Sequence, residues 1–455
     1  MKAIQSVARY FPDKCGGIQV HLSELMPEML KHGVESKMAA SQDSPQEDTY
    51  EYKGVEVYRY PVFPEPKPEP NYGQVPHGGF ERFASWLKQQ KAEIYNQHQW
   101  TPKCGLPHLR LAKELNMATV VTLHLPIPIC QRHTLMLYGQ QACDGKIEQV
   151  RCSQCCGVPK SLSAAAINNL SHTPIPISQM ARGLLRRFTS TPGTGGVIAE
   201  KLLSPFVVPT FVAARQYGLQ EMAKFADRIV VVCEWLYEAL LANGIPREKL
   251  VLCRYGIPDS FQKAAPKLKQ PSEPLRVGFL GRWSQDKGIH ILVEALKCLP
   301  TDVSIELTIH AVGDDEQYRK QILASIANDN RIHVAQPLSR EDLPSALARF
   351  DVLAVPSQWL ETGPLVVLEA HAAATPVLGS NLGGIAELVR HGVDGLLIPP
   401  NDVRAWTDAI TRLAVDANLL ERLRQGIRPV RSITTEVADI AAIYRSISRS
   451  SLIHC

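Results

Sequence analysis

Residues 355–400 read VPSQWLETGPLVVLEAHAAATPVLGSNLGGIAELVRHGVDGLLIPP. The apolar run 350–355 leads into this stretch and predicts a buried strand. A turn at 361–364 follows, and then an apolar helix that ends before Pro376, because proline cannot continue a helix. A second strand, the glycine pair at 383–384 and another helix repeat this order. Two successive strand–turn–helix units predict an α/β fold with a doubly wound parallel sheet.

The first turn of this stretch carries two carboxylates. Glu361 precedes the helix and Glu369 lies within it. Backbone N–H groups of Gly363, Leu365 and Val366 would point out of the helix start, at the positive end of its dipole, where a phosphate can bind. Carboxylates beside an anion site suit a ligand with phosphates and hydroxyls, such as a nucleotide sugar. The alternative is a solvated helix cap with two surface glutamates.

Composition narrows the class of protein. The chain has 455 residues, which predicts two domains, and its net charge of +4 is too small to indicate nucleic acid. That charge fits anionic small ligands or loose contact with an anionic membrane surface. We see no run of 18 uninterrupted apolar residues and no secretory signal, so we expect a cytoplasmic protein, with peripheral contact at the inner face of the membrane as a second expectation.

A proline-rich stretch with few apolar residues, 263–274, is typical of a linker. We therefore expect a first domain at 1–262 and a second at 275–433. Residues 130–215 form an insertion within the first domain. In it, the segment 179–188 combines arginines with apolar residues and is either a solvated basic helix or a helix lying on an anionic membrane.

Two features of the first domain are candidates for ligand binding. Gly16 and Gly17 end a loop between the first strand and the first helix, where paired glycines allow a ligand close to the backbone. His124 stands at the carboxyl end of an apolar strand, 118–124, and ligands of α/β sheets bind at that edge. A tight turn and a buried core histidine are the alternatives.

The insertion carries five of the eleven cysteines. Cys130, Cys143, Cys152 and Cys155 have the spacing C-x12-C-x8-C-x2-C, and Cys156 follows directly. The final pair resembles a thiolate hairpin that grips zinc, and a structural metal would give a loop-rich insertion a reason to fold. Free thiols and redox chemistry are the alternatives, and disulfides are a rival only for an exported protein.

The second domain opens with a strand that leads into Gly281-Arg282-Trp283-Ser284-Gln285-Asp286-Lys287-Gly288. Arg282 and Lys287 lie in the loop between strand and helix, where they can converge on one diphosphate. A solvated loop is the alternative. We find no Asp-x-Asp metal pair in a suitable loop, so we expect cations of the protein to replace a metal at the leaving group.

Taken in this order, Gly16-Gly17, His124, Arg282…Lys287, Glu361-x7-Glu369 and Gly383-Gly384 resemble the retaining GT-B glycosyltransferases of family 4. The resemblance implies two Rossmann-like domains facing each other across a cleft. It also implies that the last helix, 434–455, returns to the first domain. Catalysis would need no cofactor. The zinc expected at the cysteines of the insertion would therefore have a structural role only.

The resemblance also implies roles for individual residues. Arg282 and Lys287 would hold the diphosphate of the donor, Glu369 the ribose hydroxyls and Glu361 the hydroxyls of the transferred sugar. His124 would approach that sugar. The backbone from Gly363 through Pro364 and Leu365 to Val366 would complete the phosphate cradle, and Gly16 and Gly17 would line the diphosphate and acceptor side.

The resulting hypothesis is a hexosyltransferase that retains configuration. Its donor would be a UDP- or GDP-linked sugar, and its acceptor a saccharide, a lipid-linked saccharide or a small molecule, as in polysaccharide or glycolipid biosynthesis. The rival enzyme hypothesis is a nucleotide-sugar epimerase or another GT-B enzyme such as a phosphorylase. The rival binding hypothesis is a degenerate protein that holds the sugar nucleotide without turnover.

Overall fold

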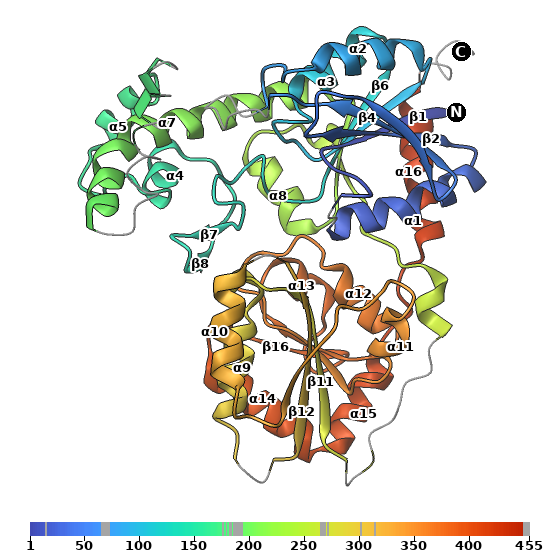
Figure 1. The fold of residues 1–455 in the computed structure, drawn as a ribbon, viewed down its shortest axis with the longest axis vertical. Coiled ribbons are helices and arrows are strands. Elements are labelled where there is room, and N and C mark those ends of the chain that lie inside the picture. The colour runs from blue at the N-terminus through green and yellow to red at the C-terminus, as the bar shows by residue number, and fades with distance from the viewer. Residues whose placement is uncertain are drawn as a thin grey trace. The chain divides into compact units, whose positions relative to one another are not determined.

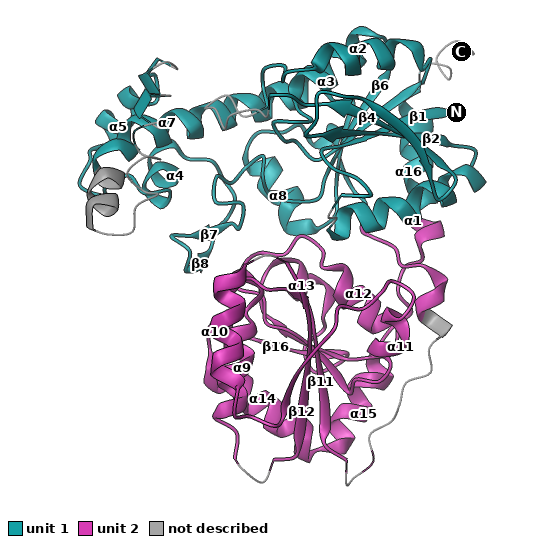
Figure 2. Cartoon of the chain, viewed as in Figure 1, with its two compact units in different colours: residues 1–253, 437–455 teal, residues 254–436 magenta. Residues whose placement is uncertain are grey.

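The computed structural model describes residues 1–13, 16–64, 73–174, 177–178, 180–181, 184, 194–263, 270, 273–300, 303–313 and 315–448. The chain divides into two compact units, and Figure 2 shows them in different colours. Unit 1 comprises residues 1–253 with 437–455, and unit 2 comprises residues 254–436.

Unit 1 contains an eight-stranded sheet in the order β10-β9-β6-β5-β1-β2-β4-β3. All neighbouring pairs run parallel except the hairpin of β3 and β4. The strands are β1 (Lys2–Val7), β2 (Glu35–Gln42), β3 (Asp48–Tyr52), β4 (Val55–Pro61), β5 (Ile94–His98), β6 (Ala118–Leu123), β9 (Arg228–Val231) and β10 (Leu250–Leu252). The helices around it include α1 (Gly17–Lys31), α2 (Phe80–Gln89), α3 (Leu106–Glu114) and α8 (Glu234–Ala242).

The insertion of unit 1 is built from short elements and one long helix. They are the hairpin β7 (Met136–Leu137) and β8 (Gln141–Ala142), followed by α4 (Gln149–Cys155), α5 (Ala164–Leu170) and α7 (Thr194–Phe225). Prolines and glycines predict short broken helices here, yet α7 runs for 32 residues with Pro205 and Pro209 inside it. Packing against α4 and α5 stabilises it in spite of the prolines.

The expected membrane contact depends on the basic segment 179–188. Most of the basic segment 179–188 lies outside the described residues. Within the described ranges, no helix has both the length and the apolar composition that spanning a bilayer requires.

Unit 2 is a six-stranded parallel sheet in the order β13-β12-β11-β14-β15-β16. Its strands are β11 (Leu275–Arg282), β12 (Ile305–Val312), β13 (Ile332–Ala335), β14 (Val352–Val355), β15 (Val377–Ser380) and β16 (Gly395–Ile398). Its helices are α9 (Ile289–Lys297), α10 (Glu316–Ile326), α11 (Leu343–Leu347), α12 (Leu365–Ala372), α13 (Gly383–Leu388), α14 (Val403–Val415) and α15 (Ala417–Gly426). Figure 1 shows these helices on both sides of the sheet.

The core of unit 2 explains why β14 is apolar at every position. Val352 and Ala354 of β14 pack in the apolar cluster beneath α9, α10 and α14. Leu353 and Val355 pack in a second cluster, with α11, α12 and α13. A strand buried on both faces needs apolar residues at every position, as parallel sheets do. The predicted α/β class, with two Rossmann-like units, is confirmed.

The unit boundary lies earlier than the expected domain end at residue 262. Unit 2 starts at Arg254 because Ile257 and Phe261 are buried in its core and the Ile257 N–H donates to the Arg431 carbonyl at 2.9 Å. Most of the expected linker, 263–274, lies outside the described residues. The last helix, α16 (Ile433–Ile447), ends in unit 1, where Tyr444 is fully buried.

Candidate active site

The candidate site of unit 2 lies at the carboxyl ends of three neighbouring strands. β14 pairs with β11 on one side and with β15 on the other, all parallel, so the loops that follow them share one edge of the sheet. These loops carry Arg282 and Lys287, the turn before α12, and the Gly383-Gly384 pair. Ligands of open α/β sheets bind at this edge.

Lys287 and Glu361 contact each other directly. The Lys287 ammonium donates to Oε1 of Glu361 at 2.6 Å. The Ser357 hydroxyl and the Trp359 indole N–H donate to the same oxygen, each at 2.8 Å. The Glu361 residue is only 6% exposed. Three donors on one buried carboxylate oxygen fix the orientation of this side chain before any ligand arrives.

Arg282 is placed differently from Lys287. It ends β11, its side chain is 58% exposed, and its guanidinium contacts the Asp286 carboxylate at 3.4 Å. The two cations therefore contact different carboxylates, Asp286 for the arginine and Glu361 for the lysine. Their convergence on one diphosphate stays a prediction.

The second carboxylate, Glu369, is 5% exposed in α12 and pairs with Arg340. Arg340 also lies over the ring of Phe261, at 4.6 Å from the centroid. Arg340 was not among the residues predicted from the sequence. A signal for it existed, because a basic residue in the loop after β13 must lie at the same edge of the sheet as the other site loops.

Glycines allow the two loops of the site to pack closely. The Gly384 N–H donates to the Glu361 carbonyl at 2.6 Å. A Cβ on Gly384 would lie 2.8 Å from that oxygen and 2.8 Å from the Gly363 nitrogen, both backbone atoms that cannot move aside cheaply. The turn continues through Gly363, with φ of +152°, and Pro364 to the first turn of α12, Leu365 and Val366. N–H groups of a first helical turn lack partners within the helix and can bind an anion.

His124 of unit 1 is almost wholly buried at the end of β6. Its Nε2 lies 3.0 Å from Nδ1 of His98, whose Nε2 lies 2.9 Å from Oε1 of Gln5. Burial lowers the pKa of His124 well below 6.5 and that of His98 to about 3, so both rings are neutral near pH 7. The Nε2 atom of His98 has two neighbours, the Gln5 oxygen, which only accepts, and the Asn96 amide nitrogen at 3.3 Å, which only donates. His98 links His124 to this buried polar cluster.

Gly16 is the N-cap of α1, and Gly17 is the first residue of that helix. Gly16 is exposed and has an extended backbone, with φ of −103° and ψ of −170°. A Cβ there would meet nothing closer than the Gln19 side chain at 3.7 Å. The fold itself therefore does not require a glycine at position 16. Close approach of a ligand to the backbone stays a prediction for this residue.

The four cysteines proposed to bind metal, Cys130, Cys143, Cys152 and Cys155, are all free and half-buried, and they line one pocket. Within the described residues, no three His, Cys, Asp or Glu side chains are arranged to hold a metal ion. The lone Cys233 is buried as an apolar run predicts, whereas Cys298 is exposed because it caps the end of α9.

Comparison with known proteins identifies the family. The family described as "Glycosyl transferases group 1" matches residues 260–429, and the "Glycosyl transferase 4-like domain" matches residues 16–152. The chain belongs to the group 1 glycosyl transferases. Both the candidate site of unit 2 and the glycines at the start of α1 lie within the matched segments.

Two curated relatives illustrate the range of this likeness. The amylovoran biosynthesis glycosyltransferase AmsK of Erwinia amylovora is 30% identical over 245 residues, which are 49% of this chain and 60% of AmsK. A D-inositol 3-phosphate glycosyltransferase of Salinispora arenicola is 31% identical over 172 residues, 36% of this chain and 38% of that enzyme. The chain thus matches less than two thirds of either relative.

Two solved structures match nearly the whole length of the chain. Alr3699/HepE of Anabaena, in complex with UDP and glucose, gives a TM-score of 0.59 at 16% identity and covers 100% of this chain and 98% of that one. Sucrose-phosphate synthase of Thermosynechococcus elongatus gives a TM-score of 0.64 at 16% identity, with 99% of each chain covered. This likeness shows the fold, which is GT-B.

Proposed function

We propose that the chain transfers a hexosyl group, with retention of configuration, from a nucleotide-diphosphate sugar to a saccharide acceptor that is free or lipid-linked. The observation that carries the proposal is the buried Glu361 carboxylate, held by Lys287 at the strand edge where such ligands bind. Two relatives have names that place them in amylovoran and colanic acid biosynthesis, which supports a saccharide acceptor. The D-inositol 3-phosphate glycosyltransferase supports the alternative, a small-molecule acceptor.

The proposed chemistry is electrostatic. A lysine ammonium has three N–H donors, so Lys287 can keep its bond to Glu361 and still donate to a phosphate oxygen. Arg282, with an exposed guanidinium, would share the charge of the departing diphosphate. Glu361 would accept from hydroxyls of the transferred sugar, and the acceptor would attack on the face that the diphosphate leaves. His124, Gly16 and Gly17 are proposed to serve the same reaction from unit 1.

The test is donor turnover by the purified chain. We expect release of nucleotide diphosphate from one member of a panel of UDP- and GDP-sugars, undiminished by EDTA, and loss of that activity in Glu361→Ala. Glu316→Ala, which changes an exposed glutamate of α10, is the matched control. Formation of an isomeric sugar nucleotide would indicate an epimerase instead. Tight nucleotide binding with no turnover, even with acceptors present, would indicate a degenerate protein.

Nucleotide affinity gives a separate prediction for Glu369. We expect Glu369→Ala to raise the Kd for the matching nucleoside diphosphate about 10- to 150-fold, because hydrogen bonds to a charged group contribute about 1.5–3 kcal/mol. Isothermal titration calorimetry measures this, with Glu316→Ala as the control again. An unchanged Kd in a folded Glu369→Ala protein would remove the ribose contact from the proposal.

A further inference from the structure

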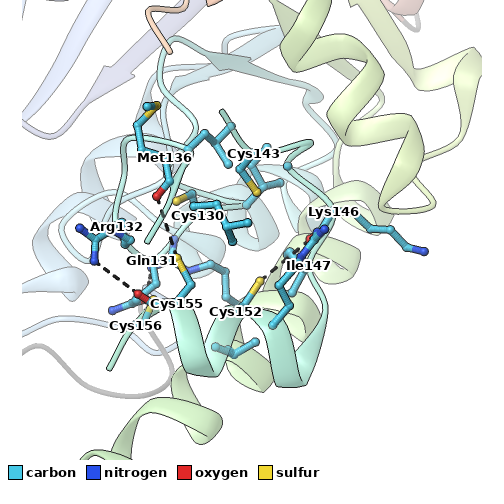
Figure 3. A pocket seen from close by; sticks show the side chains of 17 residues that line it. Cys130, Gln131, Arg132, Met136, Cys143, Lys146, Ile147, Cys152, Cys155 and Cys156 are labelled. Atoms are coloured by element: carbon cyan, nitrogen blue, oxygen red, sulfur yellow. Dashed lines mark hydrogen bonds between the residues drawn. The ribbon is translucent and has the colours of Figure 1, made fainter. Parts of the chain in front are cut away.

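The five cysteines of the insertion meet at one small pocket of about 30 Å³, although they come from separate segments. Cys130 lies in the loop after β6, Cys143 directly follows β8, and Cys152 and Cys155 lie one turn apart on α4. Figure 3 shows these four cysteines around the pocket, with Cys156 beside them. Residues that the sequence spacing groups together are therefore also neighbours in space.

Hydrogen bonds hold two of the four sulfur atoms at this pocket. The Tyr138 N–H donates to the sulfur of Cys155 at 3.1 Å. The Cys143 thiol donates to Oδ1 of Asp144 at 3.7 Å, and the turn that follows has a positive φ of +76° at Gly145. These contacts fix where the two side chains lie beside the pocket.

The charges around the pocket suit a tetrathiolate site. Four thiolates on a divalent cation carry a net charge of −2, and Arg132, Lys146, Arg151 and Arg215 line the same pocket. Arg151 also donates to both oxygens of Asp144, at 2.7 and 2.9 Å, which fixes the turn that presents Cys143. Positive side chains at this density compensate the charge that coordination would leave.

The elements that carry the cysteines are short. α4 and α5 have seven residues each, and isolated helices of that length are unstable in water. They pack against α7, and apolar residues of the insertion such as Ile147, Val158 and Ile167 are buried. A link between the loop after β6, the β7–β8 hairpin and α4 would add to the stability that this packing provides.

We propose that Cys130, Cys143, Cys152 and Cys155 form a structural site for one zinc ion. Binding releases the four thiol protons and replaces them with four Zn–S bonds, without any change of oxidation state. Because the thiols are not at coordinating geometry in the structure, rotation of the cysteine side chains must close the ring around the ion. The site has no part in catalysis and goes beyond the proposed transferase activity. Cys156, although beside the pocket, is left outside the ligand set.

Elemental analysis of the full chain, purified under reducing conditions, tests the proposal. We expect one zinc per chain, loss of that zinc in Cys152→Ser, and its retention in the matched control Cys156→Ser. Exchange for cobalt should give the visible absorption of a tetrahedral thiolate complex in the wild-type protein, so the test stands even where Cys152→Ser fails to fold. A chelator should lower the unfolding temperature of the wild-type protein.

Three results would overturn the zinc site. One is a folded, zinc-free chain whose insertion thiols all react with a thiol reagent before any chelator is added. A second is a mass deficit of two protons per cysteine pair, which indicates disulfides. The third is zinc lost equally from Cys152→Ser and Cys156→Ser. None of these depends on a sugar substrate, so failure here leaves the transferase proposal untouched.

Discussion

Replacing Lys287 with methionine is expected to lower kcat for donor turnover about 10²- to 10³-fold, the usual effect of removing one preorganised donor from a developing charge. Methionine keeps the apolar stem and removes the ammonium that contacts Glu361. Steady-state kinetics of nucleotide release measures the effect. Lys297→Met, which changes a surface lysine at the end of α9, is the matched control and should leave kcat unchanged.

The same substitution has a structural cost that must be separated from catalysis. It leaves the buried Glu361 carboxylate without its charged donor, which costs about 1–3 kcal/mol of unfolding free energy. In the double variant Lys287→Met/Glu361→Gln this cost should largely disappear, since a neutral amide needs no cation beside it. Activity should stay lost. A Lys287→Met protein that turns donor over at the wild-type rate would remove this residue from the mechanism.

The sequence identified both members of this pair but not their contact. Lys287 and Glu361 are far apart in the chain, and each was assigned its own role. They meet because β11 and β14 are adjacent in the sheet, and strand order does not follow from the spacing of motifs. Arg340 escaped prediction for the same reason. Its pairing with Glu369 requires the relative positions of α12 and the loop after β13.

In unit 1, the pattern of apolar residues does not predict every strand of the sheet. β2 has the sequence ESKMAASQ, which is too polar to predict a strand, yet it lies in the sheet between β1 and β4. Its burial comes from tertiary context rather than from its own hydrophobicity. The prolines of α7 gave the opposite error, because they predict short broken helices where the structure has one helix of 32 residues. Contacts from outside hold this helix in place, as when Gln149 of α4 donates to the Pro209 carbonyl at 2.8 Å.

Acidification is expected to destabilise the fold between about pH 6.5 and pH 5, before carboxylates titrate. In the unfolded chain a histidine takes up a proton near pH 6.5. In the folded chain burial holds the pKa of His98 at about 3 and that of His124 well below 6.5. The unfolded state therefore binds more protons as the pH falls, and each such histidine costs about 2 kcal/mol of stability by pH 5.

Urea unfolding at a series of pH values measures this loss, and His98→Gln isolates one contribution. The variant loses the bond between His98 and His124, so it should be less stable at every pH. The slope of its unfolding free energy with pH should nevertheless be smaller than the wild-type slope by about 1.4 kcal/mol per pH unit below pH 6, the share of one proton. His333→Gln, which changes an exposed histidine of β13, is the matched control. Equal slopes in His98→Gln and wild type would mean that His98 is protonated in the folded protein.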